Sequence, residues 1–547
     1  MKNIISLILA IAITTAFPYF YSDYSNKERV RVLINDTEIV FSSETGYPIY
    51  DDDNNILLPI RTVMETMGAT VIWEAEKKLI SIQLGEYKLA AQVDAAYYYL
   101  NDNKYNNEVP LRNFMDIVYF SPEEILQKMD YNVKWSDYDR TLSIESKVES
   151  GIINKIPSAY DLRKTGKVTS VKDQKEIGAC WAFAALGAIE SVLISQREYD
   201  FSEDHMSLNH GYKVSQNQGG DFHILMSYLA RWDGPVLEEE DAYGDGETNP
   251  FAKAAVRVQE AKILPSKDYA AIKLSVLLYG GVESVLFFEE ALLESNNNIY
   301  KKENNAYYYK GNAKYNHAIV ITGWDDDYPK ENFAIVPEGN GAFICKNSYG
   351  EGFGDKGYFY VSYYDKHIGT ENVVFSRIDD IKRFDNIYQS DYLGWIGKLG
   401  YGEESAYFAN AYTPRHEKET LEAVSFYTTG EKNSYEIYLV EKFRSSADFK
   451  RKKLLTSGNI EYKGYYTIDL KEPILIEDKY AVVVKLTTPG TTLPVAAEYY
   501  KKVSWLDKVV ISDGEGYMSF DGNAWDSTEK TYDSNICLKA FTKTVKK

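Results

Sequence analysis

The chain has 547 residues, of which 44% are hydrophobic, and this composition predicts several buried cores rather than a disordered polymer. A chain of this length has room for about three or four domains of ordinary size. The formal net charge of -20 at pH 7 argues against nucleic acid and against an anionic membrane as partners, since both require a basic surface.

The first residues have the composition of a secretory signal. A single lysine precedes an apolar run from Ile4 to Ala16, and small residues end that run. We therefore expect residues 1–16 to be a cleaved signal peptide and the protein to be secreted, with attachment to the cell surface as an alternative. An uncleaved anchor stays open because apolar residues continue to Tyr21, but Pro18 makes this a poor membrane helix, which needs about 20 apolar residues. We expect no membrane span in the mature chain.

Cysteine use also points to export from a bacterium. The chain has only three cysteines, Cys180, Cys345 and Cys537, whereas eukaryotic extracellular proteins of this size usually carry several disulfides. The odd number leaves at least one thiol unpaired, and a free thiol in an exported protein is a candidate for chemistry.

Residues 30–148 contain an internal repeat. The segments LLPIRTVMETMGATVIWEAEKKLISI (57–82) and YFSPEEILQKMDYNVKWSDYDRTLSI (119–144) align at a constant separation of 62 residues. Each predicts a short helix followed by two strands around a charged turn. The pattern resembles the copper amine oxidase N-terminal-like domain of bacterial surface proteins. No histidine precedes His205, so we expect a structural module without a histidine-built copper site.

The segment around Cys180 predicts a nucleophile at a helix N-terminus. After Gly178, apolar residues recur at helical spacing to about Ser195. Unpaired backbone amides and the positive end of the helix dipole favour a thiolate there. Since the dipole contributes only about 0.3–1 kcal/mol when exposed, full activation requires a cationic neighbour, normally histidine.

His317 is the best placed of the six histidines to be that neighbour. It begins the predicted apolar strand NHAIVITGW, and Asn347 further along offers a neutral acceptor that could fix the imidazole tautomer. From the residues alone, a structural histidine at the head of a strand remains the alternative. Cys345, two residues before Asn347, is interpreted as a small buried hydrophobic residue.

Several segments of the chain resemble motifs of the papain family of cysteine proteases. DQKEIGACWAF resembles the active-site segment of papain and the cathepsins, NHAIVITGW the histidine strand, and KNSYGEGFGDKGYFYV the asparagine segment. SEDHMSLNHG and NQGGDFHILMSYL resemble the segments between them. The resemblance implies a two-lobed protease domain over residues 156–380 that needs no cofactor and no metal.

The resemblance also implies a role for each matching residue. Cys180 would attack the substrate carbonyl, His317 would act as general base and acid, and Asn347 would orient His317. The Gln174 side chain and the Cys180 backbone amide would form the oxyanion hole. Substrate binding would use the backbone of two glycines, Gly219 and Gly220.

Some positions depart from the family pattern. Ile177 replaces the cysteine that usually forms a neighbouring disulfide, and Tyr349 and Phe353 stand where tryptophans are usual. An inserted loop, DDDYPKENFAIVPEGNG, follows the histidine strand. Its aspartates, residues 325–327, raise the possibility of bound calcium, but the ligand spacing of a calcium loop is missing, which favours a solvated insertion.

Residues 385–543 alternate apolar and polar side chains between turn signals, a pattern typical of a β-sandwich. Because the strand pattern is self-contained, we expect this tail to fold without the rest of the chain. The insertion and the tail together resemble a bacterial branch of the papain family with a C-terminal lectin-like domain. A cell-surface glycan is therefore a candidate partner, and a domain that only packs against the protease is the alternative.

The predicted fold class is α+β and multidomain: a papain-like two-lobed cysteine protease with an N-terminal α+β repeat module and a C-terminal β-sandwich. The predicted function is a secreted or cell-surface endopeptidase that hydrolyses protein substrates through a thiolate–imidazolium pair of Cys180 and His317 and an acyl-thioester intermediate. Two alternatives stay open. One is a cell-wall amidase or transpeptidase that uses the same cysteine and histidine. The other is a catalytically idle surface adhesin.

Overall fold

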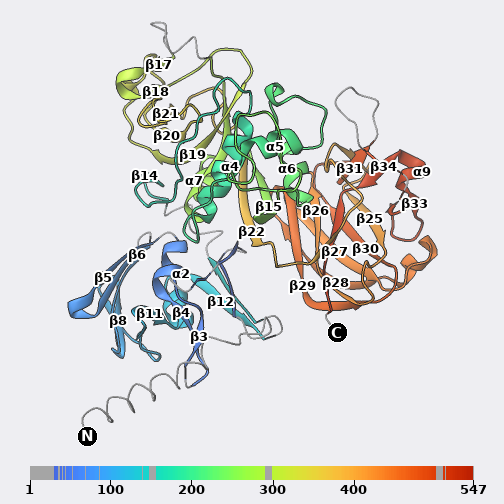
Figure 1. Ribbon diagram of the computed structural model, residues 1–547, viewed down its shortest axis with the longest axis horizontal. Coiled ribbons are helices and arrows are strands. Elements are labelled where there is room, and N and C mark those ends of the chain that lie inside the picture. Colours follow the sequence, from blue (N-terminus) through green and yellow to red (C-terminus); the bar gives the residue numbers. More distant parts are fainter. Residues whose placement is uncertain are drawn as a thin grey trace. The chain divides into compact units, whose positions relative to one another are not determined.

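The computed structural model describes residues 30–34, 37–39, 41–42, 45–51, 53–67, 69–84, 87–137, 140–146, 156–289, 299–499, 509–511 and 513–545. The chain divides into two compact units, Met1–Val148 and Glu149–Lys547 (Figure 1). The signal peptide expected at residues 1–16 lies outside the described residues. Among the residues that are described, no helix is both long and apolar enough to cross a membrane.

The first unit contains two copies of one helix–strand–strand motif, which confirms the repeat predicted from the sequence. The first copy is α2 (Ile60–Thr66), β5 (Thr70–Glu74) and β6 (Leu79–Leu84). The second copy is α3 (Pro122–Lys128), β12 (Tyr131–Ser136) and β13 (Thr141–Ser146). Met67 and Met129, equivalent in the repeat, are buried in one shared core.

Each copy of the motif belongs to a different sheet of the first unit. β5 and β6 continue into β7 (Tyr87–Gln92), β8 (Tyr97–Leu100) and β9 (Asn103–Asn106) as an antiparallel meander. β12 and β13 pair with β1 (Arg31–Ile34) and β2 (Thr37–Glu38) in the order β12-β13-β1-β2. Since β1 pairs parallel with β13, the start of the described chain is held by the end of the repeat.

The second unit begins with a helical lobe, green in Figure 1. It contains α4 (Cys180–Leu193), α5 (Glu203–Asn209) and α6 (Phe222–Ala230). Every residue of α4 after Cys180 is buried, and Glu190 is its only charged side chain. Such an apolar helix is stable only inside a protein core. The helix predicted from Cys180 to about Ser195 therefore forms and ends at Leu193.

The second lobe is an antiparallel sheet in the order β21-β20-β19-β16-β22, partly covered by α7 (Tyr269–Leu278). The strands are β16 (Val282–Leu286), β19 (His317–Asp325), β20 (Ala342–Lys346), β21 (Tyr358–Ser362) and β22 (Asn372–Asp380). Trp324, Phe343 and Phe359 fill its core together with Cys345. Cys345 is fully buried, as the sequence predicted.

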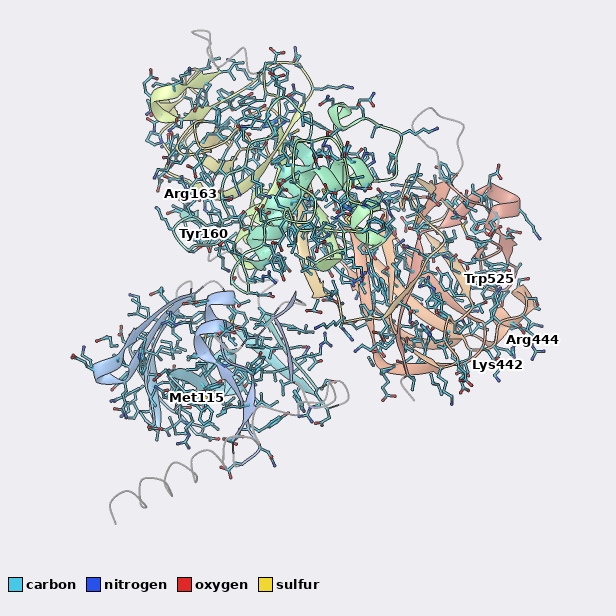
Figure 2. All side chains as sticks on the ribbon, in the orientation of Figure 1. Met115, Tyr160, Arg163, Lys442, Arg444 and Trp525 are labelled. Atoms are coloured by element: carbon cyan, nitrogen blue, oxygen red, sulfur yellow. The ribbon has the colours of Figure 1, made fainter. Side chains whose placement is uncertain are left out.

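A short strand at the start of the protease region pairs with the C-terminal end of β19. β14 (Ala159–Asp161) pairs antiparallel with it, and the rings of Tyr160 and Trp324 lie 5.4 Å apart. Tyr160 and Arg163 are labelled in Figure 2. Arg163 then forms ion pairs with Asp161 at 2.9 Å and with Asp355 at 3.0 Å. The strand that carries His317 is therefore paired on both sides.

The tail is a β-sandwich, as the alternation predicted. One sheet contains β26 (Glu419–Thr428), β29 (Lys463–Ile476), β31 (Val495–Tyr499) and β35 (Leu538–Thr544). The facing sheet contains β25 (Ser405–Tyr412), β27 (Asn433–Val440), β28 (Lys453–Ile460) and β30 (Tyr480–Thr487). Phe408, Phe426 and Val484 are among the buried side chains of the core between them.

The sandwich and the protease share one sheet, which the self-contained strand pattern did not predict. β15 (Val256–Leu264) pairs with β22 on one side and with β29 on the other. Arg377 of β22 reaches across this junction to Asp469 of β29 at 3.0 Å. Trp395 of the tail packs in the same buried cluster as the apolar side chains of α4. The two domains therefore share both hydrogen bonds and an apolar core.

The shared core makes Trp395 a stability determinant of both domains. Its ring lies 4.9 Å from His223 of α6 and is only 7% exposed. We expect Trp395→Ala to lower the free energy of unfolding by about 3–5 kcal/mol, measured by urea denaturation. Phe520→Ala is the control, because Phe520 is 57% exposed and its loss should change stability by less than about 0.5 kcal/mol. Equal effects of the two substitutions would contradict the shared core.

Candidate active site

Cys180 is the first residue of α4, and its thiol is partly exposed, whereas those of Cys345 and Cys537 are buried. Ala179 precedes the helix and makes no side-chain cap, so the first amides of the helix are free to point at the thiol. Burial raises the pKa of Cys180, and the backbone N–H groups of Ala318, Trp181 and Cys180 itself oppose this shift. The contact with Ala318 places the thiol beside the first residues of β19.

His317, which precedes Ala318, is buried at the start of β19. Its Nε2 lies 2.7 Å from Oδ1 of Asn347, and that oxygen also accepts the backbone N–H of Ser348 at 2.9 Å. A carbonyl oxygen only accepts, so Nε2 carries the proton and Nδ1 is left as the basic nitrogen. Burial lowers the pKa of His317 to about 4, and the hydrogen bond to Asn347 opposes this shift. Burial thus favours the neutral imidazole, whose Nδ1 can take a proton.

Aromatic side chains surround the bond between His317 and Asn347. The ring of Tyr349 lies 5.0 Å from the imidazole, and the ring of Phe288 lies 5.2 Å from it. Phe353 packs against both of these rings at 5.9 Å. Tyr349 and Phe353, at the positions where tryptophans are usual in the papain family, thus cover this bond together with Phe288. Phe288 was missed by the sequence reasoning because it follows β16 outside any motif.

Gln174 is held by the segment that follows Asn347. Its backbone N–H donates to the Ser348 carbonyl at 2.8 Å, and its Oε1 accepts the Ser348 hydroxyl at 2.6 Å. Its Nε2 donates to the Ile177 carbonyl at 2.8 Å. The amide nitrogen has a second N–H, which leaves one donor for a ligand. Gln174 is thus a rigid donor on the loop that leads to Cys180.

Gly219 and Gly220 precede α6, and Gly220 lies against the first turn of α4. Gly219 has φ +76° and ψ -175°, a conformation that favours glycine. A Cβ on Gly220 would approach the ring of Trp181 to 2.5 Å, so only glycine fits against the first turn of α4. The side chain of Asn217 accepts the backbone N–H of Gly178 at 2.9 Å, which ties this loop to the residues before Cys180. Cys180, His317, Asn347, Gln174, Gly219 and Gly220 are therefore all gathered around the start of α4.

A buried ion network supports the loop of Gln174. Lys172 donates to Glu190 at 3.0 Å, to Glu203 at 2.9 Å and to the Phe201 carbonyl at 2.8 Å. Burial would lower the pKa of Lys172, but the carboxylates of Glu203 and Glu190 raise it above its usual range. All three donors of the ammonium are satisfied, which a buried charge requires. The sequence signal was Glu190, a lone charge in an apolar helix, but no spacing rule linked it to Lys172.

The aspartates of the inserted loop are engaged within the protein. Asp326 accepts from Lys273 and from the Tyr363 hydroxyl, the latter at 2.6 Å. Oδ1 of Asp325 accepts the backbone N–H of Asp327 at 3.0 Å. Within the described part of the chain, no group of three or more histidine, cysteine or acidic side chains is arranged to hold a metal ion.

Three family models match the chain in succession. The model of the copper amine oxidase N-terminal domain matches residues 33–144, that of the papain family cysteine protease matches residues 156–378, and that of the lectin-like domain matches residues 387–542. Cathepsin K of Mus musculus is 26% identical over 302 residues, which are 54% of this chain and 81% of the cathepsin. Pro-cathepsin H of Mus musculus is 26% identical over 48% of this chain and 74% of its own length.

Two solved structures resemble both the protease and the tail. The clostridial cysteine protease Cwp84 after propeptide cleavage has a TM-score of 0.63 and 26% identity, and the match covers 71% of this chain and 100% of that one. The cysteine protease and lectin-like domains of Cwp84, a surface layer associated protein of Clostridium difficile, give a TM-score of 0.61 and 25% identity over 71% and 89% of the two chains.

Proposed function

We propose that this chain, a cysteine protease whose residues 156–378 form a papain-family domain, is a secreted or surface-attached endopeptidase that uses Cys180 as its nucleophile. One observation carries the proposal. His317, whose imidazole is hydrogen-bonded to Asn347 at 2.7 Å, is the first residue of β19. The backbone N–H of the next residue, Ala318, points at the Cys180 thiol. A nucleophile, a base and an orienting group in this order are the components of nucleophilic acyl transfer.

The reaction then follows from the positions of the donors and acceptors. Nδ1 of His317 takes the thiol proton, and the Cys180 thiolate attacks the carbonyl carbon of the substrate. The second N–H of Gln174 and the Cys180 amide donate to the resulting oxyanion. His317 returns the proton to the leaving amine, and water hydrolyses the acyl-thioester by the reverse sequence of proton transfers.

Burial disfavours a thiolate on Cys180 or an imidazolium on His317 when the other residue is neutral. It raises the pKa of Cys180 and lowers that of His317 to about 4. A thiolate and an imidazolium formed together neutralise each other, so the site favours the pair over either single ion. We propose that the proton moves between Cys180 and His317 as a coupled step rather than by separate titration.

Protein substrates and export are the remaining parts of the proposal. The residues 1–16 have the composition of a secretory signal, and Cwp84, which resembles both domains, is described as surface layer associated. Gln174, fixed toward the site, supports peptide hydrolysis over the alternative of a cell-wall amidase or transpeptidase. The intact set of Cys180, His317 and Asn347 speaks against an idle adhesin.

The assignment of Cys180 as nucleophile predicts different activities for alanine variants of the three cysteines. We expect Cys180→Ala to abolish cleavage of a denatured protein substrate while the unfolding transition stays unchanged. Cys345→Ala and Cys537→Ala should keep most of the activity, since both thiols are buried in apolar clusters. Purified wall peptides serve as the competing substrate, and their cleavage in place of the protein would support the amidase alternative. A Cys180→Ala variant that still cleaves the protein would show that Cys180 is not the nucleophile.

The oxyanion role of Gln174 predicts a large effect on turnover. Gln174→Ala should lower kcat by about 100- to 1000-fold, with a much smaller change in KM, because the lost donor acts on the transition state. Ser348→Ala removes only the hydroxyl that orients the Gln174 amide and should lower kcat by about 10-fold or less. A Gln174→Ala enzyme with the turnover of the wild type would refute this role.

We also propose that the tail binds a cell-surface glycan, on the strength of its match to the lectin-like domain. The test uses the full chain with Cys180→Ala on a glycan array, with and without calcium. Binding to one glycan class at micromolar or tighter apparent affinity is the expected result. Blank arrays under both conditions would favour a tail that only packs against the protease.

A further inference from the structure

One buried carboxyl group near the nucleophile has no role in the proposed reaction. Glu283 lies on β16, where alternate side chains face opposite sides of the sheet. Val282 and Leu286 point into the core of the sheet lobe, and the Ser284 hydroxyl bonds to the Asn372 side chain at 3.0 Å. Glu283 and the partly exposed Val285 therefore belong to the other face.

That other face is the one that meets the helical lobe. The partners of Glu283 on the neighbouring strands are Val320 of β19 and Val373 of β22. Both valines pack in the same buried cluster as the apolar side chains of α4 and α6. Glu283 is thus an acid on a largely apolar surface between the two lobes, behind the position of Cys180.

Among the residues that the structure describes, no basic side chain forms an ion pair with Glu283. The side chain is 6% exposed, and its Oε2 has no hydrogen-bond partner. Burial raises its pKa to about 8, and the nearby Cys180 and Asp221 raise it further because both bear negative charge when ionised. An unpaired buried carboxylate destabilises a fold, and such groups concentrate at functional sites.

Asp221 shows which part of the cleft Glu283 faces. It directly follows Gly219 and Gly220, the glycines whose backbone we expect to bind the substrate. Its carboxylate caps α6 and is exposed. Asp221 also acts on the pKa of Tyr315, which lies two residues before His317 and is 46% exposed. Glu283 is therefore within electrostatic range of both Cys180 and Asp221, and Asp221 is within range of Tyr315.

We propose that Glu283 is a specificity-determining residue that binds a basic side chain, lysine or arginine, on the acyl side of the scissile bond. The inference rests on the proposed function. The apolar stem of such a side chain suits Tyr315 and Val285, and its cation supplies the partner that Glu283 lacks. Asp221 at the surface attracts the same cation. A neutral substrate side chain would leave the carboxyl group buried and unpaired.

The test is a set of peptides with lysine, arginine or norleucine at each of the three positions before the scissile bond. For the wild type, a basic residue should raise kcat/KM over norleucine at one of these positions. Glu283→Gln should lower that preference by about 10- to 100-fold, as expected for the loss of a hydrogen bond to a charged group, and leave cleavage of the norleucine peptide largely unchanged. Glu283→Leu should favour norleucine at the same position.

Glu303→Gln is the matched control, because Glu303 is an exposed carboxylate of the same lobe, and it should keep the wild-type preference. If the wild type cuts the peptides without a basic preference at any of the three positions, or if Glu283→Gln keeps that preference, the inference is wrong and the proposed function stands. If no peptide is cut and a thiol-directed epoxide fails to label Cys180, the proposed function itself fails and the inference fails with it.

Discussion

The close packing of α4 against β19 is the constraint on which the site depends. A Cβ on Gly187 of the helix would lie 3.6 Å from the side chain of Val320 on the strand. On the adjoining loop, a Cβ on Gly281 would come within 2.5 Å of the same valine. A methyl group at Gly187 would make an ordinary contact with Val320, whereas any side chain at Gly281 would displace that valine. Because Cys180 and His317 come from these two elements, the spacing of the small residues sets the position of the thiol relative to the imidazole.

The buried interface that this packing creates also determines which charged side chains are stable around the site. Lys172 is accommodated because three carboxylates and a carbonyl satisfy it, so the loop of Gln174 is anchored by ion pairs and a hydrogen bond. Glu283 in the same interface has an oxygen without any partner. One arrangement is complete within the folded chain, and the other is completed only by a ligand. Lys172 therefore stabilises the fold, whereas Glu283 is available to bind a substrate.

The sequence predicted those parts of the molecule that depend on local spacing. The helix after Cys180, the strand beginning at His317 and the repeat of residues 57–82 and 119–144 all follow from periodicity and motif. Phe288, Lys172 and Glu283 could not be found in this way. Each acts through residues far away in the chain, and their partners are fixed by the order of strands in the sheet. The pairing of β15 with β29 was missed for the same reason, because alternation describes a strand but not its neighbour.

That pairing has a mechanical consequence for the enzyme. β15 hydrogen-bonds to the protease on one edge and to the sandwich on the other, and Trp395 places a tail side chain in the core that also holds α4. Bending between the domains would break ladder hydrogen bonds and expose apolar surface, so the junction resists the hinge motion usual between domains. A ligand held by the tail would then fix the orientation of the cleft as well. The position of the tail's ligand, and not the length of a flexible linker, would decide which peptide segments reach Cys180.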